Sequence, residues 1–276
     1  MIFSRDIADY PEGIVLAVDK PYRWTSADVI RKLKYAAIKH FGKKNLKVGH
    51  AGTLDPLATG VLLVCIGNAC KRAQELQDHD KEYIARIRFG ATTPSYDLEK
   101  EVDRQFPFEH ISADAVRAAL PAFLGEQEQV APLFSAKSVD GVRAYELARK
   151  LYRAGNTEAI DAAALETLQR NKINISELEL LDFTEEGSRS DGSATSIPSS
   201  ASSRINVADT SGLGLPEATI RIACSKGTYI RAFARDLGEA LNSGAHLSGL
   251  IRSRSGDFTI DKALSVEEAL ALLQAE

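Results

Sequence analysis

The chain has 276 residues, with 34 Lys and Arg against 38 Asp and Glu, which gives a net charge of −4. Hydrophobic residues make up 44% and charged residues 26%, so a wholly disordered or fibrous chain is excluded. The longest apolar run, residues 61–66, is far shorter than the roughly 20 residues that cross a bilayer, and no signal pattern opens the chain. We therefore expect a cytoplasmic protein without membrane contact.

The three cysteines are an odd number and have no C-x-x-C spacing. This pattern supports neither a disulfide framework nor a structural zinc site, so we expect no metal.

Charge is arranged in blocks along the chain. Residues 31–88 carry 12 basic against 5 acidic side chains, residues 137–154 carry 5 against 2, and residues 221–256 carry 6 against 2. If these three blocks share one face, the protein can bind a polyanion despite its negative total charge. The alternative is a set of ordinary solvated faces.

The elements can be predicted in chain order. Residues 14–19 form a strand, and the spacing of Thr25 and Asp28 predicts a capping box at the start of a helix that Gly42 ends. Further strands are predicted over residues 61–66, 82–89, 173–183 and 219–224, and further helices over residues 112–124, 144–154, 228–241 and 265–273. This irregular interleaving favours an α+β fold with a mixed, largely antiparallel central sheet flanked by helices.

Residues 187–214 differ from the rest of the chain. They include nine serines, no aromatic residue and almost no apolar periodicity. Such a segment buries too little surface to offset the entropy lost on ordering, so we predict a mobile loop that joins two strands.

The densest group of candidate residues, residues 49–60, reads G-H-A-G-T-L-D-P-L-A-T-G and directly precedes the apolar strand. Its glycines permit close backbone approach, and Pro56 keeps Asp55 out of helical geometry. A carboxylate held in this way is well placed to act, although an ordinary Asp-Pro turn has the same pattern. No G-K-[ST] follows the glycines, which excludes a phosphate-binding P-loop.

Two other segments carry candidates. The run C-S-K-G-T-Y-I-R passes from a predicted strand into a helix and brings Tyr229 and Arg231 to the end of the sheet. Arginine can pair with a buried carboxylate, and tyrosine offers a stacking face with a polar tip. The run K-x-Y places Tyr83 at the start of a strand. Each segment alone is more typical of core packing or a surface pair than of a site.

Five motifs occur together and in order, namely D-K-P-x-x-W-T-S, G-H-x-G-T-L-D-P-x-A-T-G-V-L, K-x-Y, C-S-K-G-T-Y-I-R and G-A-H-L-x-x-L-x-R. Together they resemble the TruB family, the bacterial tRNA pseudouridine-55 synthases, from about residue 14 to residue 269. The resemblance implies the pseudouridine synthase fold, and isomerisation of uridine 55 in the T loop of tRNA without a cofactor.

The resemblance also implies catalytic roles. Asp55 stands at the position of the family's nucleophilic aspartate, and whether it attacks the ribose or the base remains open. Arg231 matches the arginine that pairs with this aspartate and keeps it ionised. Tyr83 matches the tyrosine that stacks on the target uracil and is a candidate base for the proton on carbon 5.

The target uridine must flip out of its stack. His50 matches the histidine that enters the vacated space, and Tyr229 and Leu250 match residues that line the uridine pocket. Lys20 belongs to a motif beside the active site, where we count it among the substrate-binding residues although a structural role fits it better. Asp97 falls in a segment that resembles a family loop and receives no role.

The predicted organisation is a catalytic domain over residues 1–256, interrupted by a flexible insertion at 187–214. Residues 257–276 form a short tail in place of a full C-terminal RNA-binding domain. The expected partner is the T arm of tRNA, with no obligatory protein partner and a monomeric state. A noncatalytic tRNA-binding protein and a synthase within a guide-RNA particle are the alternatives.

Overall fold

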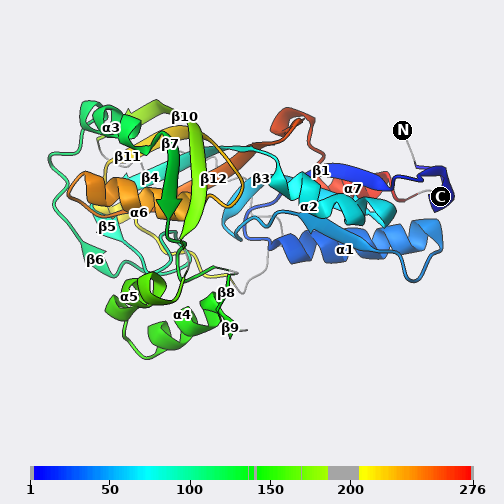
Figure 1. The fold of residues 1–276 in the computed structure, drawn as a ribbon, viewed down its shortest axis with the longest axis horizontal. Helices are drawn as coiled ribbons and strands as arrows, with labels where there is room; N and C mark the ends of the chain where they lie inside the picture. Colours follow the sequence, from blue (N-terminus) through cyan, green and yellow to red (C-terminus); the bar gives the residue numbers. More distant parts are fainter. Residues whose placement is uncertain (1–2, 136, 140–141, 169, 186–204, 275–276) are drawn as a thin grey trace. The chain divides into compact units, whose positions relative to one another are not determined.

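The structure is a computed structural model that describes residues 3–135, 137–139, 142–168, 170–185 and 205–274 (Figure 1). The described chain divides into two compact units. The first unit holds the residues up to Tyr83 and those from Ile251 onward, and the second unit holds those from Ile84 to Leu250. The predicted boundary at residue 256 separates a catalytic domain from a C-terminal tail, not two compact units, and it stays a prediction.

The first unit is built around a strand that is buried over almost its whole length. This strand, β3 (Ala58–Ile66), pairs antiparallel with β1 (Ile14–Lys20) from Ile14↔Ile66 to Lys20↔Gly60, and also with β2 (Val48–Ala51). The other elements of this unit are α1 (Ser26–Phe41), α2 (Ala73–Asp78), β13 (Phe258–Thr259), α7 (Val266–Ala271) and the short 3-10 helices η1 (Ile7–Asp9), η2 (Gly67–Arg72) and η5 (Ile260–Lys262).

The helix α1 begins and ends where the sequence predicts. Thr25 and Asp28 form the capping box, and Gly42 ends the helix with a φ of 61°. The buried face includes Val29 and Leu33, and α1 contacts β2, β3 and α7. A reciprocal cap satisfies N–H groups that have no partner within the helix, so the start of α1 is fixed.

The second unit contains the long strand β10 (Asn171–Thr184). It pairs antiparallel with β11 (Glu217–Cys224) along one edge and with β7 (Gly125–Gln129) along the other. The other elements are β5 (Ala91–Thr92), β6 (Arg104–Gln105), α3 (Ala113–Ala119), η3 (Leu120–Phe123), β8 (Ser138–Val139), β9 (Val142–Arg143), α4 (Ala144–Arg153), α5 (Glu158–Thr167), η4 (Ser211–Leu213) and α6 (Ile230–Ala240).

Two strands run from one unit into the other. The strand β4 (Lys81–Phe89) crosses the division after Tyr83, and β12 (Ala245–Ser255) crosses it after Leu250. Together with the antiparallel pairs above and the seven α-helices of the described chain, they confirm the predicted α+β fold with a largely antiparallel central sheet.

The structure also contains elements that the sequence analysis did not predict. Among them is α5, whose buried Ile160 and Ala164 pack against Ala148 of α4. Another is β12, whose sequence contains Gly249 and a histidine and lacks the clean alternation of a half-buried strand. Packing against neighbouring elements explains both, because such contacts override weak local preference.

The end of the serine-rich segment differs from the prediction. Residues 186–204 lie outside the described residues, but residues 205–214 are described and lead into β11. Ala208 and Thr210 each expose only 3% of their surface, and the Ala208 amide donates to the Leu98 carbonyl oxygen at 2.8 Å. The predicted mobile loop is therefore wrong for this part of the segment, because it packs onto the second unit.

Among the residues that the structure describes, no helix is long and apolar enough to span a membrane.

Candidate active site

Asp55 lies in the loop between β2 and β3, and its side chain is half-buried. Arg252 of β12 fixes the first part of this loop. Its guanidinium donates to the carbonyl oxygens of Gly52 at 3.2 Å, Thr53 at 3.4 Å and Val61 at 2.6 Å. Arg252 is only 1% exposed, so these bonds form away from water, where each is stronger.

The start of α1 fixes the middle of the same loop. The Ser26 hydroxyl accepts a hydrogen bond from the Leu54 amide at 3.0 Å and donates to the Leu54 carbonyl oxygen at 3.2 Å. The carbonyl oxygen of Asp55 itself accepts from the Ala58 amide at 3.1 Å. The peptide groups on both sides of the Asp55 side chain are thus held by hydrogen bonds.

Lys20 fixes the end of the loop. Its Nζ donates to the carbonyl oxygens of Trp24 at 2.6 Å, Pro21 at 2.9 Å and Pro56 at 3.2 Å. The side chain is fully buried, and desolvation lowers the pKa of Lys20 to about 7, against the attraction of the Asp55 carboxylate. An ammonium group has three N–H donors, and here backbone oxygens accept all three. This geometry is that of a loop support, and a direct contact of Lys20 with substrate stays a prediction.

His50 of β2 lies five residues before Asp55 and is half-buried. Burial lowers the pKa of its imidazole, and the Arg252 guanidinium lowers it further. Its Nδ1 is buried and has no hydrogen-bond partner within the described chain. The residue as a whole keeps part of its surface exposed, and its contact with the substrate stays a prediction.

Tyr83 of β4 is 8% exposed, and its ring belongs to the buried hydrophobic residues. Two residues earlier, Lys81 Nζ donates to the carbonyl oxygens of Gln77 and His79, which ties α2 to the start of β4. The aromatic side chain therefore comes from a strand end whose position is fixed.

The second unit holds Arg231 and Tyr229 at the start of α6. Tyr229 is the residue before the helix, and its amide donates to Gln129 Oε1 at 2.8 Å while its carbonyl oxygen accepts from Gln129 Nε2 at 3.2 Å. These two hydrogen bonds to Gln129 of β7 fix the point at which the helix begins. Leu250 of β12 is half-buried.

Arg231 pairs with a carboxylate that received no role from the sequence. Its Nε lies 3.6 Å from Asp97 Oδ2, and its Nη1 donates to the Ser95 carbonyl oxygen at 3.1 Å. Asp97 Oδ1 accepts from the Ser95 hydroxyl at 2.6 Å and from the Glu99 amide at 2.9 Å. The predicted pairing of Arg231 with Asp55 stays a prediction, and Asp97 is its ion-pair partner within the second unit.

Comparisons with known proteins identify the family. Residues 38–230 match the family model described as TruB family pseudouridylate synthase, N-terminal domain. The chain belongs to the TruB family. It is similar to tRNA pseudouridine synthase B of Phocaeicola vulgatus, with 48% identity over 94% of this chain and 92% of that protein. The protein of the same name from Flavobacterium johnsoniae is 42% identical over 95% of this chain and 98% of that one.

Solved structures agree on the fold. A Cbf5-Nop10-Gar1 complex matches with a TM-score of 0.60 and 22% identity, over 96% of this chain and 56% of that chain. An archaeal box H/ACA Nop10-Cbf5 complex matches with a TM-score of 0.58 and 21% identity, over 97% of this chain and 56% of that chain. The chain thus spans about half the length of these structural neighbours, and the likeness concerns the fold alone. As a TruB-family member, the protein is a pseudouridine synthase, which confirms the predicted enzyme class.

Two residues of this TruB-family site were missed at the sequence level. Arg252 ends the quoted motif G-A-H-L-x-x-L-x-R, but nothing local shows that its side chain points inward. Asp97 belongs to a run of small and polar residues whose burial depends on contacts distant in sequence. The only available signal was the resemblance of both segments to family motifs.

Proposed function

We propose that this TruB-family synthase converts uridine 55 in the T loop of tRNA to pseudouridine, with Asp55 as the nucleophile. The observation that carries the proposal is the Asp55 loop. Its backbone from Gly52 to Pro56 is held by Arg252, Ser26 and Lys20. A nucleophile must sit within a fraction of an ångström of its target, and a loop fixed in this way supplies that constraint. The relatives named tRNA pseudouridine synthase B support the same substrate.

The reaction is an isomerisation that needs no other reactant. The Asp55 carboxylate bonds to the ribose or to the base, the bond between the sugar and N1 of uracil breaks, and the freed uracil rotates. Carbon 5 then bonds to the sugar, Asp55 leaves, and the proton on carbon 5 is removed while N1 gains one. A carboxylate suits this task because it can form a covalent bond and then leave, which divides one difficult exchange into easier steps. Tyr83 is the proposed base for the carbon 5 proton.

The substrate must be flipped out of the T loop before the reaction can start. We assign to His50 the space that the uridine leaves, and to Tyr229, Leu250 and the Tyr83 ring the walls of the uridine pocket. His50 is only half-buried, and the part of the residue that stays accessible supports its part of this assignment.

The test is to map pseudouridine in a T-arm hairpin and in full tRNA after incubation with wild type, Asp55→Asn and Asp55→Glu. We expect conversion at position 55 by wild type only, with hairpin affinity of the Asp55→Asn variant within about threefold of wild type. Modification that survives Asp55→Asn would exclude the nucleophile, and tRNA binding by a wild type that converts no uridine would favour the noncatalytic alternative.

The same assay tests the expected partners. Purified chain alone should complete the reaction, which would agree with a monomer that needs no protein partner. A requirement for a guide RNA or a second protein would favour a synthase that works within a particle. A tRNA substrate also fits the expected cytoplasmic location.

A further inference from the structure

The backbone on both sides of Asp97 is held by hydrogen bonds to its two neighbours in the chain, Tyr96 and Leu98. The Tyr96 carbonyl oxygen accepts from the Leu247 amide of β12 at 3.0 Å, and the Leu98 carbonyl oxygen accepts from the Ala208 amide at 2.8 Å. Tyr96 has a φ of 57°, a left-handed conformation that side chains rarely adopt. Because this conformation is unfavourable in isolation, the bonds on either side of Asp97 are needed to keep the segment in place.

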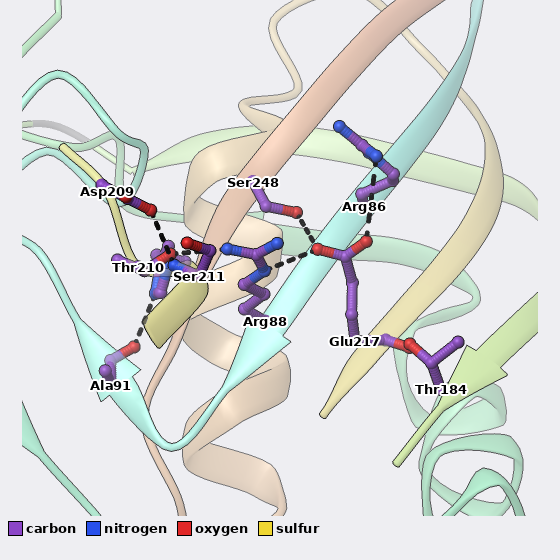
Figure 2. A network of polar contacts seen from close by, with 10 residues as sticks. Arg86, Arg88, Ala91, Thr184, Asp209, Thr210, Ser211, Glu217 and Ser248 are labelled. Atoms are coloured by element: carbon purple, nitrogen blue, oxygen red, sulfur yellow. Dashed lines mark hydrogen bonds and ion pairs between the residues drawn. The ribbon is translucent and has the colours of Figure 1, made fainter. Parts of the chain in front are cut away.

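Glu217 of β11 is linked to the residues that make both of these backbone hydrogen bonds (Figure 2). Its Oε2 accepts from the Ser248 hydroxyl at 2.6 Å, and Ser248 directly follows Leu247 in β12. The same Oε2 accepts from Arg88 Nε of β4 at 2.7 Å. One carboxylate at the start of β11 thus holds both β4 and β12.

Arg88 also contacts the end of the serine-rich segment. Its Nη1 donates to the Thr210 hydroxyl at 2.8 Å, two residues after Ala208, as Figure 2 shows. The Ser211 amide donates to Asp209 Oδ1 at 2.9 Å, which fixes the turn between them. Arg88 and Glu217 expose only about a tenth of their side chains, 10% and 9%, so water competes little for these bonds.

We propose that Glu217, Arg88 and Thr210 are positioning residues for the Asp97–Arg231 pair. Glu217 holds one neighbour of Asp97 through Ser248 and Leu247, and holds the other through Arg88, Thr210 and Ala208. The segment 205–214 is then part of the support of the active site. This inference rests on the proposed function and on the catalytic role that the family resemblance implies for Arg231.

A purely structural role for the same network is the competing explanation, since buried ion pairs also stabilise folds once they are formed. The two explanations differ in what happens when Asp97 is already changed. A positioning residue acts through Asp97, so its substitution should have little further effect in an Asp97→Asn background. A residue that only stabilises the fold should lower activity and stability by the same factor in both backgrounds.

The central variant is Thr210→Val, which keeps the shape of the side chain and removes the hydroxyl. We expect kcat on tRNA to fall about tenfold with KM unchanged. The reason is that the variant loses the hydrogen bond from Arg88 that holds residues 208–210 in place. Thr210→Ser should restore the rate, since it restores the hydroxyl. The control is Thr184→Val, because the Thr184 hydroxyl donates to the backbone oxygen of Glu217 at 3.4 Å and not to the carboxylate that holds Ser248 and Arg88. It should keep the wild-type rate.

Ser248→Ala removes the hydrogen bond between Ser248 and Glu217 and provides a second variant if Thr210→Val folds poorly. Hydrogen exchange of the peptide over residues 93–99 gives a readout that does not depend on activity, and exchange should rise in both variants but not in Thr184→Val. In the Asp97→Asn background, Thr210→Val should change the rate less than twofold.

Equal losses in both backgrounds, or unchanged exchange over residues 93–99, would overturn the inference. A wild-type protein that converts no uridine in tRNA would instead refute the proposed function, while the exchange measurement would still decide whether the network holds the Asp97 segment.

Discussion

Arg231 Nε lies 3.6 Å from Asp97 Oδ2, and both side chains are more than nine-tenths buried. Removing either charge takes an opposite charge away from a buried group, which is more costly than losing a surface pair. The Arg231 guanidinium also donates to the Ser95 carbonyl oxygen, and the Ser95 hydroxyl donates to Asp97. Charge and hydrogen bonds together fix the orientation of the arginine.

We predict that Asp97→Asn lowers kcat for pseudouridine formation by about 10- to 100-fold, because Arg231 loses its fixed orientation. The amide oxygen can still accept from Ser95 and Glu99, so the segment should keep its backbone path. The matched control is Asp103→Asn, which changes a carboxylate nearby that accepts from the Thr92 hydroxyl at 2.8 Å. Equal rates for the two variants, measured by single turnover, would contradict the prediction.

Arg252→Lys should impair the Asp55 loop. A lysine offers one compact ammonium and cannot reach the carbonyl oxygens of Gly52, Thr53 and Val61 at once, as the planar guanidinium does. We expect a loss of about tenfold or more in kcat and of about 2 kcal/mol in the free energy of unfolding. Arg254→Lys is the control on the same strand, because within the described part of the chain its guanidinium makes one hydrogen bond, to the Gly256 carbonyl oxygen at 3.4 Å. Wild-type kcat in Arg252→Lys would show that the loop needs no such support.

Two glycines of the first unit should respond very differently to alanine. Gly60 has a φ of 100°, and an added Cβ would lie 2.3 Å from the Arg252 carbonyl oxygen, so Gly60→Ala must separate β3 from β12. Gly42 has a φ of 61° with open space around it, so Gly42→Ala meets only backbone strain. Urea denaturation should show a loss above about 3 kcal/mol for Gly60→Ala and about 1–2 kcal/mol for Gly42→Ala. Similar losses for both would be inconsistent with the close contact at Gly60.

The sequence predicted the parts of this molecule that local signals control. The capping box at Thr25 and the end of α1 at Gly42 depend on a few neighbouring residues, and the structure confirms both. The link between Asp97 and Arg231 joins residues 134 positions apart, and the burial of Arg252 depends on a loop 200 positions away. No local pattern encodes such contacts. For the same reason, the composition of residues 205–214 predicted a mobile loop, although Ala208 and Thr210 are buried by contacts with distant residues.

Lys20 should make the stability of the protein depend on pH. Burial lowers its pKa in the folded state to about 7, against 10.5 for an ordinary lysine. Between these two values the unfolded chain binds a proton that the folded chain does not bind, so the free energy of unfolding should rise with pH across this window. The slope is at most about 1.4 kcal/mol per pH unit, and it vanishes below pH 7 and above pH 10.5.

Lys20→Met cannot bind the proton and should lack this contribution, whereas the exposed Lys262→Met should keep it. Urea denaturation between pH 6.5 and about pH 9 checks the difference between wild type and Lys20→Met. Parallel curves for the two proteins would mean that Lys20 stays charged in the folded state, held by the carbonyl oxygens of Pro21, Trp24 and Pro56 and by the nearby Asp55 carboxylate.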